Sequence, residues 1–308
     1  MVFAGTPGGV YRVAEQSGRT ERVFDASVRQ LQTDGDAVLA ATDAGVVRSS
    51  DGGESWVNLG LTDVHALCCT PDAIYAGGRP AALYRSVDDG RTWTRHAQFQ
   101  RVADGADWPT NPHREEAWVR TVAASEGGAV LLVGIEVGGF LASTDGGDSW
   151  QQFDAVPDDV HDAVPVSSER WVLSCGVGGP EKRGGVFETT DGGETWTERD
   201  LGPYEYVRAS CYQGQLYTAG NRSAPPWRPP EAGLFVEHDG KLDRVSYPGE
   251  PESFVISWAT SGEAVFAGTN DGTVLRGHSR QWEQLGTVPV TAEAQRAWGV
   301  RSLAVPEP

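Results

Sequence analysis

Lysine is almost missing from this chain of 308 residues, although arginine is not. Only Lys182 and Lys241 occur, so 23 of the 25 basic residues are arginine, against 43 aspartates and glutamates and a formal net charge of −18. A surface this acidic repels phosphate, which excludes nucleic acid and anionic membranes as expected partners. Scarce lysine with abundant acid and arginine is typical of salt-in halophiles, where charges are screened within about 3 Å at 1 M salt. The composition therefore predicts a halophilic, archaeal source.

Cysteine and long apolar runs are also scarce. Four cysteines are too few for a disulfide framework and have no metal-ligand spacing, so we expect buried thiols in strands. No segment approaches 18 consecutive apolar residues, which excludes a membrane-spanning helix. The first residues have neither a basic start nor an apolar run, so no secretory signal is expected. We expect a cytoplasmic monomer without a cofactor or a metal. The four cysteines are Cys68, Cys69, Cys175 and Cys211.

A repeated turn dominates the sequence. The eight residues "STDGGDSW" at 143–150 contain one apolar side chain, two glycines and several residues that favour turns. Nearly the same turn recurs at 49–56, 86–93 and 189–196, each time ended by a tryptophan and preceded by a run with β-strand character. Because the turn recurs together with a pattern of strands, the chain is best interpreted as a series of structural repeats.

Seven such repeats can be counted, three of them without the full acidic turn. Each repeat contains four expected strands: a first such as "VRTVAA" (119–124), a second such as "AVLLVG" (129–134), a third, and a fourth. Four strands in about 40 residues, with glycine-rich turns, are typical of propeller blades. The first repeat, 2–24, lacks its first strand, which 299–305 supplies. We predict one all-β domain over 1–308, a seven-bladed β-propeller with four-stranded antiparallel blades, its ring closed by the C-terminal strand.

The spacing Ser/Thr-x-Asp-x-Gly-x-x-Trp resembles the Asp box of propellers with bacterial-neuraminidase repeats (BNR). Four full copies on a sevenfold repeat carry the resemblance, which covers essentially the whole chain. In that family the box is the hairpin between the third and fourth strands of a blade. Its aspartates can accept hydrogen bonds from backbone amides of their own turns, and its glycines can take positive φ. The residues are Asp51, Gly53, Trp56, Asp88, Gly90, Trp93, Asp145, Gly147, Trp150, Asp191, Gly193 and Trp196.

These repeated carboxylates could instead mark calcium sites or catalysis. In a propeller, however, the hairpin between the third and fourth strands lies on the face opposite to the one where ligands usually bind. We therefore expect the boxes to be scaffold, one hairpin lock in each blade.

Ligand-binding candidates come from the opposite face. Aligning the repeats at the second residue of each first strand places basic residues at six of seven equivalent positions around the expected channel. These positions hold Arg301, Arg29, His65, Arg120, His161, Arg208 and Ile256. A second set, at the end of each second strand, holds Pro7, Asp43, Arg79, Glu136, Val177, Asn221 and Asn270. Long loops at 104–118, 176–185 and 220–233 are expected beside them.

Two roles remain open for the basic positions. Arginine forms good hydrogen bonds between blades, so some of these side chains can be structural. As a functional set they would bind an anionic small molecule, a carbohydrate or an acidic protein segment at the mouth of the channel, with Arg79 and Glu136 beside them. Mixed His and acid side chains in the same region, His65 and His161 with Glu136 and Asp162, could also bind a metal.

The family resemblance allows three kinds of function. Sialidases of the BNR type use a Tyr–Glu nucleophile pair and an Asp, which makes Tyr206, Glu205, Asp162 and Glu136 the catalytic candidates of a glycoside hydrolase. The sialidase Arg-Ile-Pro start is absent, however, and sialidases have six blades. Xyloglucan-type hydrolases share the repeat. Seven-bladed photosystem II assembly factors, which bind protein, are similar in repeat type and size. We expect a binding propeller, with the glycoside hydrolase as the alternative, because fold alone does not choose between them.

Overall fold

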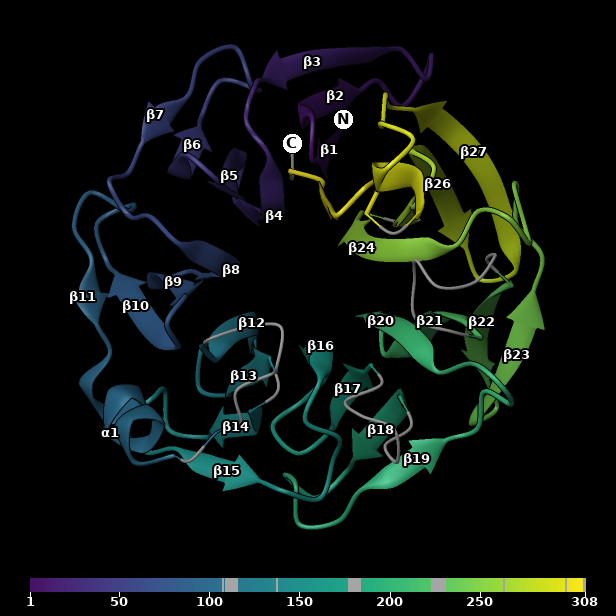
Figure 1. Ribbon diagram of the computed structural model, residues 1–308. Coiled ribbons are helices and arrows are strands. Elements are labelled where there is room, and N and C mark those ends of the chain that lie inside the picture. The colour runs from purple at the N-terminus through teal and green to yellow at the C-terminus, as the bar shows by residue number, and fades with distance from the viewer. Residues whose placement is uncertain are drawn as a thin grey trace. The chain divides into compact units, whose positions relative to one another are not determined.

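The structure, a computed structural model, describes residues 1–106, 108, 116–136, 138–176, 184–222, 231–262, 264–296 and 298–306. Its strands form seven four-stranded antiparallel sheets (Figure 1), so the fold class is the predicted seven-bladed β-propeller. Helical structure in the described ranges is limited to α1 (Ala97–Gly105) and a 3₁₀ turn (Ala294–Arg296). No helix of the described part has the length and apolar character needed to cross a membrane.

The chain divides into two compact units, residues 1–58 with 201–308 and residues 59–200. The first unit holds four blades, numbered in chain order. Blade 1 is β28 (Ser302–Ala304), β1 (Val2–Thr6), β2 (Gly9–Val13) and β3 (Thr20–Phe24), and blade 2 is β4 (Val28–Asp34), β5 (Ala37–Thr42), β6 (Gly45–Ser49) and β7 (Val57–Asn58). Blade 6 is β20 (Tyr206–Tyr212), β21 (Gln215–Asn221), β22 (Ala232–His238) and β23 (Lys241–Val245), and blade 7 is β24 (Val255–Ser261), β25 (Ala264–Thr269), β26 (Thr273–His278) and β27 (Gln281–Thr287).

The second unit holds three blades and the helix. Blade 3 is β8 (Val64–Thr70), β9 (Ala73–Gly78), β10 (Ala82–Ser86) and β11 (Thr94–Arg95), and blade 4 is β12 (Trp118–Ala124), β13 (Leu131–Glu136), β14 (Gly139–Ser143) and β15 (Gln151–Phe153). Blade 5 is β16 (Val160–Pro165), β17 (Trp171–Cys175), β18 (Gly185–Thr189) and β19 (Thr197–Arg199). Within each unit, the first strands of consecutive blades contact one another.

The two ends of the chain build blade 1 together, as the repeat predicted. β28 pairs antiparallel with β1, and Ala4 lies opposite Leu303. The Ser302 hydroxyl then accepts a hydrogen bond from the Leu31 amide of blade 2 at 2.9 Å. The C-terminal strand therefore joins the N-terminal blade and also ties it to the next one.

The cores lie between consecutive blades of a unit, and they explain the recurring "AG" of the second strands. Glycine there allows close approach of the next blade. A Cβ atom at Gly77 would lie 2.2 Å from Val119, and one at Gly134 would lie 2.9 Å from Val160. The same holds for Gly5 against Val28 and Gly268 against Val300, where a Cβ atom would lie 2.5 Å from the valine. The glycines are therefore packing residues of the blade interface.

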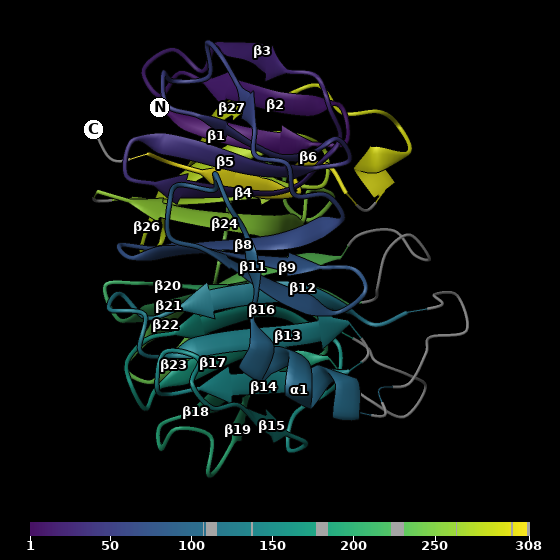
Figure 2. The same cartoon turned by 90° about the vertical axis from the view of Figure 1, so that its left-hand side faces the viewer.

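Helix α1 was not predicted from the sequence. It follows blade 3, and Figure 1 and Figure 2 both show it beside β14. The His96 side chain accepts the Phe99 amide at the start of the helix, and Phe99 is fully buried. The spacing of Phe99, Val102 and Ala103, which all pack on the core between blades 3 and 4, was the available signal for a helix.

Candidate functional site

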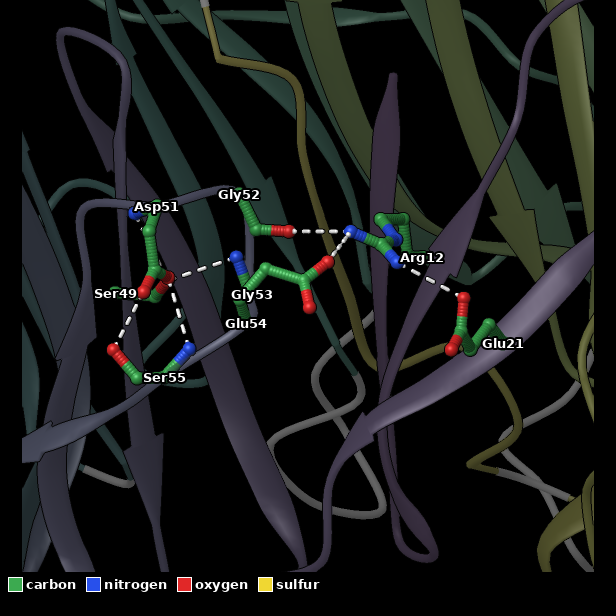
Figure 3. A network of polar contacts seen from close by, with 8 residues as sticks. All are labelled: Arg12, Glu21, Ser49, Asp51, Gly52, Gly53, Glu54 and Ser55. Carbon is green, nitrogen blue, oxygen red and sulfur yellow. Dashed lines mark hydrogen bonds and ion pairs between the residues drawn. The ribbon is translucent and has the colours of Figure 1, made fainter.

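The acidic turns, defined here as residues 49–56, 86–93, 143–150 and 189–196, are each closed by their own side chains, and Figure 3 shows the one in blade 2. Asp51 Oδ1 accepts the Ser55 amide at 2.9 Å and the Ser49 hydroxyl at 2.8 Å, and Oδ2 accepts the Ser55 hydroxyl at 2.5 Å. The Ser49 hydroxyl also accepts the Gly53 amide at 2.9 Å. These bonds, that from the Ser55 hydroxyl first, lower the pKa of Asp51 to about 2.

The other three turns repeat this geometry. Asp88, Asp145 and Asp191 accept the same three bonds within their turns, and each has a pKa lowered to about 2 by them. In all four blades the turn connects the third and fourth strands. Both carboxylate oxygens of each aspartate are therefore engaged inside the turn.

In blades 4 and 5 the glycine and the tryptophan of the turn face the segment that precedes their own blade. A Cβ atom at Gly193 would lie 2.4 Å from Phe153 of blade 4, and one at Gly147 would lie 2.6 Å from His96, which follows blade 3. Trp196 packs edge-on against Phe153, with ring centroids 6.4 Å apart, and Trp150 against Phe99 at 5.3 Å. The turn is thus a lock between blades as well as a closed hairpin.

Arg12 of β2 adds a polar link between blades 1 and 2 (Figure 3). Its guanidinium donates to the Gly52 carbonyl at 3.2 Å, to Glu54 at 2.7 Å and to Glu21 at 2.9 Å. The hydrogen bonds that Arg12 donates to the two carboxylates, Glu21 first, raise its pKa. The acidic turn of blade 2 is therefore held from outside by a neighbouring blade.

The basic positions aligned in the sequence are mostly β-bulges. The strand register jumps over one residue near the start of five first strands, so that residue has no opposite partner in the ladder. The skipped residues are Arg29, His65, Arg120, His161 and Ile256. Arg208 pairs in regular register with Ala219, and Arg301 directly precedes β28. A bulge re-aims its side chain, and bulges are frequent beside functional sites.

In the second unit the structure brings four of the candidates into contact. Trp118 pairs with Glu136 across β12 and β13, the His65 ring lies 5.6 Å from the Trp118 ring, and the Arg79 guanidinium lies 5.1 Å from its centroid. Arg120 forms an ion pair with Glu136, which is only 6% exposed. The positive charge of Arg120 is therefore matched by a buried carboxylate.

Asp159 extends this cluster and was missed by the sequence analysis. Its backbone forms an isolated antiparallel β-bridge with Glu136. Its Oδ1 lies 4.0 Å from Arg120 Nη1, and its Oδ2 lies 3.3 Å from His161 Nε2. His161 is 4% exposed. Gly176 leaves room for the pair, because a Cβ atom there would lie 2.4 Å from Asp159 Oδ2. This part of the cluster holds two carboxylates, Glu136 and Asp159, with Arg120 and His161.

In the first unit the arginines have different surroundings. Arg301 donates to the Val28 carbonyl at 3.1 Å and to the Ser27 hydroxyl at 3.3 Å. Burial, and then the positive charge of Arg29, lower the pKa of Arg301. Arg208 is 9% exposed and donates to the Tyr206 hydroxyl at 3.2 Å, with its guanidinium 5.4 Å from the Tyr206 ring centroid. Within the described ranges, neither Arg208 nor Arg301 forms an ion pair.

The four catalytic candidates are divided equally between the two units. Asp162 accepts a hydrogen bond from the Ser174 hydroxyl at 2.6 Å, and Glu136 faces Arg120. Tyr206 is buried, and Glu205 precedes it in the other unit. No group of three or more His, Cys, Asp or Glu side chains among the described residues is arranged to hold a metal ion.

Two of the candidates at the ends of second strands accept hydrogen bonds from backbone amides. Asn221 accepts the Glu231 amide at 2.6 Å, and Asn270 accepts the Phe254 amide at 2.8 Å. Val177 lies outside the described residues, as do 107, 109–115, 177–183 and 223–230 of the three expected loops. The four cysteines lie in strands and form no disulfide; Cys68 and Cys175 are buried, whereas Cys69 and Cys211 are only partly buried, contrary to the expectation. Burial raises the pKa of the Cys68 thiol to about 12.

Comparison with known proteins supports the fold alone. No family model matches the chain, and no curated protein matches it. The GH74 xyloglucanase of Xanthomonas campestris is 16% identical with a TM-score of 0.62, over 92% of this chain but 46% of that one, so the chain spans about half its length. YCF48 bound to a D1 peptide is 15% identical with a TM-score of 0.56, over 84% of this chain and 80% of the other. The WD40 repeats of RRP9 are 14% identical with a TM-score of 0.62, over 99% and 89%.

Proposed function

We propose that this chain is a non-catalytic binding propeller of the Asp-box type, and that it binds a carboxylate or a similar anion, free or on an acidic segment of a partner protein. The observation that carries the proposal is the pair Arg29 and Arg301 in the first unit. Burial, and then the like charge of Arg29, lower the pKa of Arg301. A largely buried guanidinium with a second positive charge nearby favours a bound anion.

The local structure supports binding by this pair. Arg29 is the extra residue of a bulge, so its side chain is turned out of the regular strand ladder. Arg301 is fixed by the Val28 carbonyl and the Ser27 hydroxyl, which use one of its terminal nitrogens. A guanidinium that is already oriented loses less conformational freedom when it binds a carboxylate in bidentate fashion.

Arg120 has a different part in this proposal. Its ion pair with Glu136 and the nearby Asp159 leave the cluster of the second unit without excess positive charge. We therefore assign anion binding to the first unit and an orienting, structural role to Arg120. The YCF48 structure with a D1 peptide supports the protein-segment form of the ligand, since it shows that a propeller of similar fold binds a peptide.

The test is the affinity for citrate and for an acidic peptide, measured by calorimetry at the lowest KCl concentration at which the protein is fully folded. Arg29→Gln should weaken both by about tenfold or more, the scale of a lost charge-assisted hydrogen bond. The matched control is Arg22→Gln, since Arg22 is exposed and paired with Asp25. A variant that is less stable and binds unchanged would show that Arg29 is purely structural.

A glycoside hydrolase is the alternative, and one observation favours it. Glu136 and Asp159 both approach Nη1 of Arg120 in the second unit, and glycosidases use two carboxylates about 5–9 Å apart. Release of reducing sugar from xyloglucan or from sialylated glycans decides the matter. Hydrolytic activity that is lost in Glu136→Gln would replace the binding proposal with a hydrolase. We expect the protein to show no such activity.

A further inference from the structure

A groove of about 720 Å³ opens in the first unit and is lined by none of the residues proposed above. It lies between the β20–β21 turn, with Tyr212 and Gln213, and the start of β25 and the β26–β27 hairpin, from Arg276 to Glu283. Its volume is within the range of small-molecule sites, about 300–1,000 Å³. The groove thus belongs to blades 6 and 7.

A shortened hairpin accounts for the groove. In blade 4 the acidic turn places seven residues between the end of β14 at Ser143 and the start of β15 at Gln151. In blade 7 only Ser279 and Arg280 lie between β26 and β27. Trp282 still packs against the preceding blade, with its ring 6.3 Å from that of Tyr217. Blade 7 therefore keeps the tryptophan of the repeat but lacks the turn beside it.

Trp282 gives the groove a flat wall. Its indole lies against Gly277 of β26, where a Cβ atom would be 2.3 Å from the ring. The indole nitrogen donates to the Ser279 carbonyl at 3.2 Å, which fixes the ring. The side chain is only partly buried and lines the groove. A fixed, partly exposed indole offers an apolar surface to a flat ring.

Arg276 supplies a charge without a counter-ion. Its side chain is partly buried and lines the groove, and it forms no ion pair or hydrogen bond with any residue that the structure describes, although Glu283 lies opposite it in the β26–β27 ladder. The neighbouring Arg280, by contrast, is paired with Asp243 of blade 6. In a chain with 43 acidic residues, a half-buried guanidinium without a carboxylate is the group most suited to an anion from outside.

The remaining lining groups are neutral hydrogen-bonding side chains and one carboxylate. Gln213, Gln281, His278 and Glu283 stand around the groove. Gln213 uses one amide hydrogen on the Tyr212 hydroxyl at 3.0 Å, which leaves its carbonyl oxygen for a ligand. Such groups match several hydroxyls, and an aromatic acid has none to offer. The lining therefore fits a hydroxylated ring better than an aromatic one.

We propose that this groove is a binding site for a sugar acid, a pyranose ring that carries a carboxylate. The ring lies on Trp282, the carboxylate meets Arg276, and the glutamine amides meet the hydroxyls. This site is separate from the anion site of the proposed function, and neither depends on the other.

The experiment compares glucuronate, glucose and benzoate as probes, by calorimetry and by saturation-transfer NMR. Glucuronate should bind with a Kd below about 10 mM, and glucose and benzoate at least about tenfold more weakly. Arg276→Gln should weaken glucuronate about tenfold or more and leave glucose unchanged. Arg280→Gln, on the same hairpin with the same loss of charge, should stay within about twofold, because Arg280 is outside the lining.

A second variant distinguishes the loss of a binding side chain from the loss of the fold. Gln213→Ala changes an exposed turn residue and should lower glucuronate affinity about threefold with an unchanged circular dichroism spectrum. The proposal is overturned if glucuronate shows no saturable binding, if benzoate binds as well as glucuronate, or if Arg280→Gln weakens binding as much as Arg276→Gln.

Discussion

Two adjacent glycines in the acidic turn of blade 5 allow the cost of backbone strain to be measured apart from the cost of overpacking. Gly192 and Gly193 have φ of +69° and +95°, which side chains rarely adopt. A Cβ atom at Gly192 would meet nothing within 4 Å, whereas one at Gly193 would lie 2.4 Å from Phe153 Cε1 and 2.9 Å from Cζ. The change to alanine therefore tests the same strain twice, once with and once without the contact to blade 4.

The magnitudes follow from this geometry. Either alanine costs about 1–2 kcal/mol for its left-handed backbone. Gly193→Ala adds about 1–3 kcal/mol of overpacking, because Phe153 is only 9% exposed and cannot move aside. Its ring is held by Phe140 at 5.7 Å and by Trp171 at 6.1 Å between centroids. We expect Gly193→Ala to be less stable than Gly192→Ala by about 1–3 kcal/mol.

Urea unfolding followed by circular dichroism measures this difference, with the slope of the transition checked for each variant. The pair Gly53 and Gly52 in blade 2 is a graded control. There the nearest contact of an added Cβ atom at Gly53 is 3.1 Å, and Gly52 has none within 4 Å, so the difference should be smaller. Equal destabilisation by Gly192→Ala and Gly193→Ala would refute the idea that the turn locks against the preceding blade.

Three further predictions concern charge and the cluster of the second unit. The folded pKa of the acidic-turn aspartates is about 2, below the ordinary 3.8, so the stability that their ionised form adds is present above about pH 4 and is lost as the pH falls towards 2. Asp145→Asn should therefore make stability depend less steeply on pH in this range. An unchanged pH dependence would contradict the stabilising role of the Asp145 carboxylate. The melting temperature should rise between about 0.1 and 2 M KCl as self-repulsion is screened, and a flat or falling curve argues against a halophilic source. Gly176→Ala should destabilise by about 1–3 kcal/mol and shift the imidazole NMR signals of His161, whereas Gly127→Ala, with open space around it, should do neither.

The sequence predicted those features that depend on local spacing. In the acidic turns, the acceptor Asp51 and the groups that bind it, Ser49 and Ser55, lie within six residues of each other. The hairpin position, the number of blades and the strand supplied by the C-terminus follow from the same periodic pattern. Such contacts repeat with the sequence, so one aligned copy predicts the others.

The candidate site was less predictable because its partners come from different blades. Arg120 meets Glu136 from the next strand and Asp159 from the next blade, and no spacing in the sequence relates the three. The bulges at Arg29 and Arg120 are likewise set by how each strand meets its neighbour. The alignment grouped equivalent strand positions, but it could not show that Arg120 pairs with a carboxylate whereas Arg208 and Arg301 pair with none of the described ones.

Apart from Arg29, the partly buried arginines among the described residues divide into two kinds, and the division supports both proposed sites. A guanidinium removed from water needs a partner, and acidic side chains are abundant here. Arg12, Arg48, Arg120, Arg170 and Arg199 are each paired with a carboxylate. Arg208, Arg276 and Arg301 are also partly or largely buried, yet no carboxylate within the described ranges pairs with them. With 43 acidic residues in the chain, an unpaired and sheltered arginine is not explained by a shortage of partners, so these positions are the ones suited to anions that the chain itself does not supply.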